Sequence, residues 1–476
     1  MSLPDSINYT KIKPLSVESR SRRRQFLPEN GQRFTSTTNN IIRIPISASA
    51  FLDTKHSYLR FTLNNTTGQT LGMDFTGGSG CFQRMRVLQQ GTVLSDVQEY
   101  GRLVGAVIYP STCSQTHVGA RSISDAQRYL NSAIGGAPGG ELAPAVPAEI
   151  TGAIGNTPSN ANDTVAGGAN YIFSIPLVNG LLGSTQDKLV PLQLLNSTPI
   201  ILELTLSNVL DIGVFGGVPA AFTLQDIRYM ASLVEVGREV DDHLRQVQAA
   251  SGGRLILNGV DFSHYTGNLA PNTLGQTSIN VPCRRRSIKN FFFVGASRTY
   301  AGGGAQQLVY NQSYGGHLNL RDFQLKAGST YIPPLPVDAQ FFGGGNALAR
   351  AQVLEELAKC WGETQTSHGN GVLNRINYAV TPGDNAGMAV QSAGGAAADT
   401  LEFTPFGLDL EAFGPDGSGA QAIECGLDTA TNSIPLSLNI NLGAVIPNNE
   451  AVIIDMYVCY DSLYWIDQVG NIRVSI

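Results

Sequence analysis

The sequence predicts an all-β protein built from two strand-rich halves. Apolar and polar residues alternate with the period of a half-buried strand at 42–46, and again near the other end of the chain at 436–442. The chain also holds 53 glycines and 23 prolines among its 476 residues, as expected for many short strands separated by tight turns. This pattern is typical of sandwiches, jelly rolls and barrels.

Two loops and one link organise the strands. Residues 131–170 and 382–399 are rich in alanine and glycine with almost no large apolar side chain, so we expect each to be a long exposed loop. Residues 239–249 look helical or linking, and the strand pattern restarts after Ser251-Gly252-Gly253. The expected units are a basic N-terminal arm over 1–40, a first β domain over 41–250 and a second over 251–476.

Local signals predict a helix and a turn. Leu354, Leu357 and Trp361 share one face at helical spacing, which predicts a helix over 347–361. Asn258-Gly259 is a strong hairpin dipeptide and predicts a turn. The six cysteines lie far apart without a C-x-x-C motif, so we expect buried, reduced thiols.

Charge is sparse and unevenly distributed. Only 14% of residues are charged, against roughly 25% in an average soluble protein, which suits a protein whose faces are covered by copies of itself. The net charge is −6, but residues 1–33 hold seven basic and three acidic residues, so this segment is +4 and the rest is −10. A basic arm on an acidic body can meet phosphates, membrane headgroups or an acidic neighbour. The body as a whole is not expected to bind nucleic acid sequence-specifically.

The arm supplies the candidate contact residues, which are Lys11, Lys13, Arg20, Arg22, Arg23 and Arg24. Three interpretations of the arginine run stay open: a solvated tail, an inner-surface anchor to a membrane or an acidic scaffold protein, and a nuclear import or genome contact. A second basic run at 284–286 is interpreted as a charged strand edge or an intersubunit ion pair, with nucleic-acid contact as the alternative.

Motifs of catalysis and of metal or cofactor binding are not found in the sequence. There is no H-E-x-x-H, no G-x-x-x-x-G-K-[S/T] and no G-x-S-x-G; the stretch 77–81 comes near the last but lacks its final glycine. The six histidines are scattered, without a cysteine or acid at ligand spacing. We therefore expect a non-enzymatic protein without cofactor or metal. Met1 is followed by no apolar core of a signal peptide and no apolar run reaches about 18 residues, so neither secretion nor a spanning helix is expected.

The order of the strand sequences resembles a known family. From Ile42 to the C-terminus the chain is similar to the double jelly-roll major capsid proteins of the Polinton-like virus, virophage and adenovirus-related group. The segments that carry the resemblance are IRIPI (42–46), SYLRF (57–61), FQRMRV (82–87), FSIPL (173–177), GLLG (180–183), LVPL (189–192), PIILELTL (199–206), RSIKNFFFV (286–294), FQLKAG (323–328), FGLDLE (406–411) and the strands from 434 to 464. The alanine- and glycine-rich stretches depart from the family pattern.

The resemblance implies two tandem eight-stranded antiparallel jelly rolls, with a few short helices. It further implies homotrimers of pseudo-hexagonal outline, which would tile the icosahedral shell of a tailless double-stranded DNA virus with penton and minor capsid proteins, often over an internal membrane. The chain would then reside in the virion, and deletion of residues 1–33 would leave a soluble trimer that closes shells poorly. The alternatives are a secreted β-sandwich adhesin or sugar-binding module, and an enzyme on a cupin-like scaffold, which would need a His/Glu metal cluster.

Overall fold

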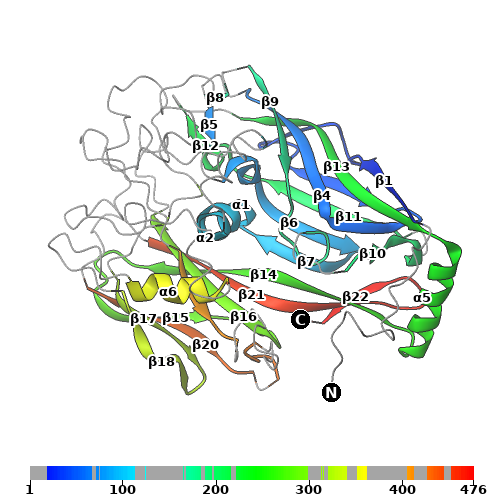
Figure 1. The fold of residues 1–476 in the computed structure, drawn as a ribbon. Coiled ribbons are helices and arrows are strands. Elements are labelled where there is room, and N and C mark those ends of the chain that lie inside the picture. Colours follow the sequence, from blue (N-terminus) through cyan, green and yellow to red (C-terminus); the bar gives the residue numbers. More distant parts are fainter. Residues whose placement is uncertain are drawn as a thin grey trace, which may run out of the picture.

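The chain forms two β-sandwiches that lie side by side, with helix α5 (Arg238–Ala250) between them in sequence (Figure 1). The computed structural model describes residues 19–66, 71–73, 76–112, 124, 164–165, 168–183, 188–195, 198–215, 221–297, 312, 315, 320–339, 351–361, 405–411, 426–431, 433–443 and 452–475. Most of the stretch 131–170 and all of 382–399, where long loops are expected, lie outside these residues.

Two antiparallel sheets face each other in the first sandwich. The first, sheet A, contains β1 (Ser19–Phe26), β2 (Arg33–Thr35), β4 (Phe51–Asn64), β9 (Asn170–Ile175), β10 (Val190–Pro191) and β13 (Thr223–Val236). The second, sheet B, contains β3 (Ile41–Ile46), β6 (Phe82–Gln89), β7 (Thr92–Gln98) and β11 (Ile200–Leu206). A small sheet of β5 (Leu71–Met73), β8 (Thr164–Val165) and β12 (Gly213–Phe215) is added to them. Thr164 and Val165 thus form a strand within a stretch expected to be loop.

The second sandwich has the same plan. Sheet D contains β14 (Leu255–Leu269), β16 (Ile288–Ser297), β19 (Phe406–Asp409), β21 (Val452–Ile466) and β22 (Ile472–Ser475). Sheet E contains β15 (Gly275–Val281), β17 (Leu320–Ala327), β18 (Thr330–Asp338) and β20 (Leu436–Leu442).

Strand order is identical in the two halves. Counting β1 with β2 as one interrupted strand and β9 with the short β10 as another, and setting aside the small sheet and the C-terminal β22, each half has eight strands among the described residues. Strands one, eight, three and six form one sheet, and strands two, seven, four and five form the other. This is the strand order of a jelly roll, so the double jelly roll predicted for the chain is confirmed.

Short helices sit at the connections. α1 (Tyr100–Arg102), η3 (Leu103–Ile108) and α2 (Tyr109–Thr112) form one helical run after β7, and α6 (Ala351–Lys359) follows β18 in the second roll. The remaining short turns are η2 (Gly77–Cys81), η5 (Leu192–Leu194) and η6 (Val209–Asp211). The helix α6 lies within the stretch 347–361 that was predicted to be helical, of which 347–350 lie outside the described residues. The link at 239–249 is the helix α5.

The apolar alternation places each core between its sheets. Ile42, Ile44 and Ile46 of β3 are fully buried, and every second residue of β20 is buried in the same way. Aromatic rings fill both cores: Phe61 meets Phe82 edge to face at 5.2 Å between ring centroids in the first roll. In the second roll Phe293 stacks on Phe406 at 4.6 Å.

Two sequence predictions are wrong, each for a physical reason. The arm expected over 1–40 is, from Ser19 on, part of the first roll, because β1 pairs with β13 from Ser19↔Val236 to Phe26↔Tyr229 and buries Phe26. The turn expected at Asn258-Gly259 does not exist, because β14 runs through both residues in unbroken register with β21. Gly259 is required there for close packing rather than for a turn.

Candidate assembly surfaces

The described residues offer contact surfaces rather than a reactive centre. Among them, no three His, Cys, Asp or Glu side chains gather closely enough to hold a metal ion. None of the described helices has the length and hydropathy needed to cross a bilayer. Cys81, Cys283, Cys360 and Cys459 are buried and unbridged, and burial raises the pKa of the thiols of Cys283, Cys360 and Cys459.

The contact between the two jelly rolls centres on a buried ion pair. Arg102 Nε, at the end of α1 in the first roll, lies 2.5 Å from Asp455 Oδ2 on β21 of the second roll. The other carboxylate oxygen of Asp455 lies 2.9 Å from Nε2 of His264 on β14. Arg102 and Asp455 expose at most 1% of their side chains, so each charge depends on the other for stability.

Hydrogen bonds extend this contact along both rolls. Tyr457 Oη donates to the carbonyl oxygen of Glu99 at 3.2 Å, one turn of chain before Arg102. The amide of Gln89 on β6 bridges to the loop and strand at the C-terminus, where it donates to Gly470 O at 3.1 Å and accepts from Ile472 N at 2.5 Å. Side-chain amides therefore satisfy backbone groups across the contact, which joins the rolls in one fixed arrangement.

A close approach of two glycines completes the contact. The loop 177–183 of the first roll packs on β14, and a Cβ atom added to Gly259 would overlap the carbonyl oxygen of Gly180. A Cβ on Gly180 would in turn lie 2.7 Å from the hydroxyl of Tyr464. That hydroxyl donates to buried Asp261 at 3.3 Å, and burial raises the pKa of this carboxyl although three hydrogen-bond donors oppose the shift.

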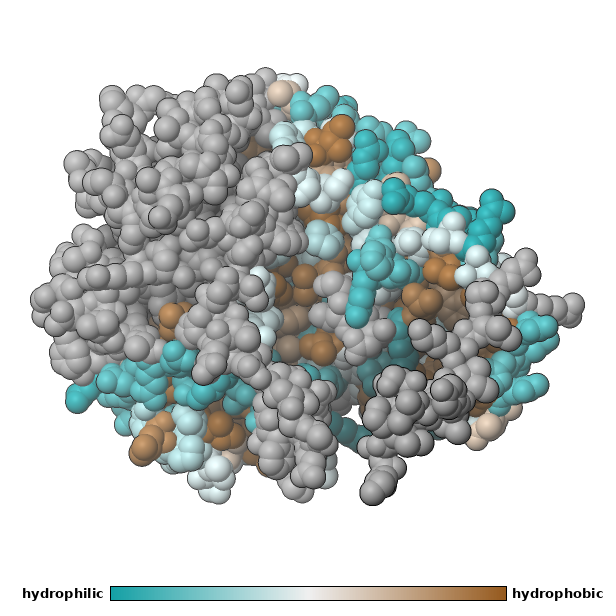
Figure 2. Space-filling model, in the orientation of Figure 1, coloured by the Kyte–Doolittle hydropathy of each residue, from teal (hydrophilic) through white to brown (hydrophobic). Residues whose placement is uncertain are grey.

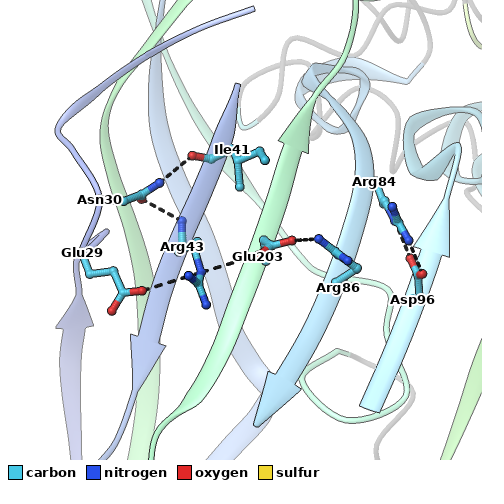
Figure 3. A network of polar contacts seen from close by, with 8 residues as sticks. All are labelled: Glu29, Asn30, Ile41, Arg43, Arg84, Arg86, Asp96 and Glu203. Atoms are coloured by element: carbon cyan, nitrogen blue, oxygen red, sulfur yellow. Dashed lines mark hydrogen bonds and ion pairs between the residues drawn. The ribbon is translucent and has the colours of Figure 1, made fainter. Parts of the chain in front are cut away.

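The outer face of sheet B carries an alternating ladder of charges (Figure 3). Arg43, Glu203, Arg86 and Asp96 stand directly opposite one another on β3, β11, β6 and β7. Glu203 contacts both Arg43, at 3.6 Å, and Arg86, and Arg84 forms two hydrogen bonds to Asp96, at 2.7 and 2.5 Å. Each charge on this face thus has an opposite charge beside it within the chain.

The four arginines proposed as arm contacts lie on β1, and they project from both faces of sheet A. Successive strand residues face opposite sides, so Arg20, Arg22 and Arg24 lie on the side of buried Phe26, and Arg23 on the outer face of sheet A. Arg22 pairs with Glu235 at 2.7 Å. Arg24 donates to Ser47 O at 3.2 Å and lies over the Phe26 ring. The structure therefore gives Arg22 and Arg24 partners inside the chain, and Lys11 and Lys13 lie outside the described residues.

The second basic run also has internal contacts. Arg285 lies over the ring of Tyr460, 4.2 Å from its centroid, and donates to Ser263 Oγ at 2.8 Å. It is held within the second roll between β15 and β16, which favours a structural role for this arginine over contact with nucleic acid.

Sequence reasoning missed most of the residues that join the rolls. Arg102 and Asp455 are 353 positions apart, so no local pattern links them. The one signal in the sequence is Asp455 itself, which lies inside the otherwise apolar run 451–460. A lone carboxylate in such a strand needs a buried partner, so its presence indicates a buried polar contact.

Two jelly rolls in tandem make this a double jelly-roll protein. No family model and no curated protein matches the sequence. PBCV-1 VP54, fitted into a reconstruction of the virophage Sputnik, matches with a TM-score of 0.56 and 10% identity over 98% of this chain and 99% of that one. The Sputnik virophage structure matches at 0.56 and 12%, over 100% and 92%, and the Faustovirus major capsid protein at 0.51 and 8%, over 96% and 92%.

Proposed function

We propose that the chain is the major capsid protein of a tailless icosahedral virus with a double-stranded DNA genome, and that its role is structural rather than enzymatic. The observation that carries the proposal is the repeated strand order of two jelly rolls joined by buried contacts. Three such chains around one axis present six similar corners, so a trimer approximates a hexagon and can tile a shell. The rolls are the proposed domains 41–250 and 251–476, with residues from Ser19 added to the first.

The surface composition suits self-association. Charged residues make up only 14% of the chain, which lowers the cost of removing its faces from water. Stable obligate interfaces bury about 2,000 Å² or more, so a large part of the surface is expected to be covered. The charge ladder of sheet B is neutralised within the chain, so it can be covered without leaving an unpaired ion.

The partners follow from the same proposal. The trimer is expected to contact other trimers, penton and minor capsid proteins, and the chain is expected to reside in the virion. The residues before Ser19, with Lys11 and Lys13, are the proposed contact to an internal membrane or an acidic scaffold protein. Arg20 and Arg23 can join that contact, because Arg22 and Arg24 already have partners in the chain.

Light scattering on a size-exclusion column tests the proposal. The purified chain should elute with three times its 50.6 kDa mass and keep that mass on dilution into the nanomolar range. A chain that stays monomeric at high concentration would argue against the capsid role.

A further inference from the structure

The outer face of sheet A carries arginines that the chain does not neutralise. Arg228 on β13 and Arg60 on β4 stand directly opposite each other, and both point away from the core because Tyr229 and Leu59 beside them are fully buried. The same alternation places Arg23 and Arg33 on this face. Among the described residues, none of these four arginines has an ion pair.

The cluster of arginines on sheet A lowers the stability of the fold unless an anionic partner covers it. Like charges directly opposite each other on neighbouring strands destabilise a sheet, and the sheet B ladder shows that the same roll can avoid this. The strands of sheet A hold three acids: Glu235 pairs with Arg22, Asp53 is held by His56 at 2.7 Å, and Asp226 has no ion pair among the described residues. In the described part of the chain, Arg228 donates only to the neutral amide of Gln25, at 3.1 Å. Hydrophilic side chains gather in this region, at the upper right of Figure 2.

Sheet E of the second roll carries two carboxylates on neighbouring strands. Asp322 on β17 and Asp338 on the edge strand β18 are directly opposite each other. Sheet E thus has a cross-strand pair of carboxylates, whereas sheet A has a cross-strand pair of guanidinium groups. Asp338 is exposed and Asp322 half-buried, with a hydrogen bond from Asn441 at 2.9 Å. Flat cross-strand pairs of opposite sign on two sheets are complementary in both charge and spacing.

The two pairs cannot meet within one chain. β13 and β4 lie at the upper right of Figure 1, and β17 and β18 lie at the lower left, on the far side of the molecule. A contact between different patches on two copies is head-to-tail, and such a contact forms a ring when the rotation between neighbouring copies closes. We infer that the arginine pair Arg60/Arg228 of one copy docks on the carboxylate pair Asp322/Asp338 of the next, an inference that rests on the proposed self-assembly.

Charge reversal tests this contact on the full-length chain. The variants R60E/R228E and D322K/D338K should each weaken self-association at least about tenfold, because each places like charges across the contact. The matched control R245Q/R473Q changes two exposed arginines elsewhere and should associate as the native chain does. Thermal melts of all variants establish that each is folded before its mass is measured.

The deciding variant carries all four reversals. R60E/R228E/D322K/D338K exchanges the two charge patterns, so every head-to-tail contact is again attractive and self-association should return to within about threefold of the native chain. Folded double variants that associate like the native chain, or a folded fourfold variant as defective as the doubles, would overturn the contact while leaving the proposed function intact. A native chain that is monomeric would overturn both.

Discussion

Arg102 of the first jelly roll and Asp455 of the second form an ion pair, 2.5 Å between Nε and Oδ2, in which neither side chain exposes more than 1% of its surface. Removing charges from water is costly, so this pair is stable only while the two rolls stay in register with each other. The same contact includes His264, Tyr457 and the glycines at 180 and 259. Buried charges, hydrogen bonds and close backbone packing therefore hold the two rolls against each other.

Loss of one charge from this pair should destabilise the whole chain. In Asp455→Asn the guanidinium of Arg102 stays buried without its counter-ion, and we expect the free energy of unfolding to fall by about 3–5 kcal/mol. Chemical denaturation measures the change. Glu235→Gln, which removes the partner of Arg22 at the surface, is the control and should cost under about 1 kcal/mol. Equal effects of the two substitutions would contradict the account of the buried pair.

The glycine contact predicts a steric effect at one position of β14. In Gly259→Ala the new methyl group would overlap the backbone carbonyl of Gly180, which cannot move without shifting the loop 177–183. We expect a loss of about 1–3 kcal/mol in unfolding free energy. Gly80→Ala is the control, since its methyl would meet Thr76 at an ordinary 3.5 Å. A Gly259→Ala protein as stable as the control would show that the rolls are not packed this closely.

The first strand predicts a sharp boundary for N-terminal deletion. A chain lacking residues 1–18 keeps β1 and should melt at the native temperature. A chain lacking residues 1–26 loses the pairing with β13 and buried Phe26, and should lose at least about 2 kcal/mol of stability. Thermal melts and limited proteolysis compare the two. The earlier expectation for deletion of 1–33 changes accordingly, because that deletion removes a strand of the roll.

Asp261 predicts a pH dependence of stability. Its carboxyl is fully buried and its pKa is raised in the folded chain, so the folded state holds the proton more tightly than the unfolded state. This group's stabilising effect is complete below the unfolded pKa and declines as pH rises toward the folded pKa, with a slope of at most about 1.4 kcal/mol per pH unit.

Asp261→Asn isolates this contribution. Asparagine cannot ionise, so subtracting the unfolding free energies of the variant from those of the native chain between pH 4 and 8 leaves the titration of Asp261. A difference that grows in favour of the native chain as pH rises would show that the pKa of this carboxyl is lowered instead.

The sequence predicted the parts of the fold that rest on local pattern. Local pattern predicts the strands at 42–46 and 436–442 and the helix of Leu354 and Leu357, because each of these elements buries one face. Strand β1 could not be predicted from the sequence. Its residues SRSRRRQF are exposed on both faces except at Phe26, so no apolar alternation indicates a strand. An edge strand that buries a single apolar side chain leaves little trace in the apolar pattern of its sequence.

Long-range packing explains the other differences. Asn258-Gly259 has the composition of a turn, but the glycine is needed where Gly180 approaches, and no local pattern distinguishes these two causes. The ion pair of Arg102 with Asp455 and the opposed pairs Arg60/Arg228 arise only once strands distant in sequence are aligned. Sites built by topology in this way need the strand register before they can be identified.

Electron microscopy of the purified chain tests the capsid role most directly. Class averages of the assembled species should show a pseudo-hexagonal particle with a central threefold axis and six peripheral densities, two from each chain. Averages that show only single two-lobed particles across the accessible concentration range would contradict the account.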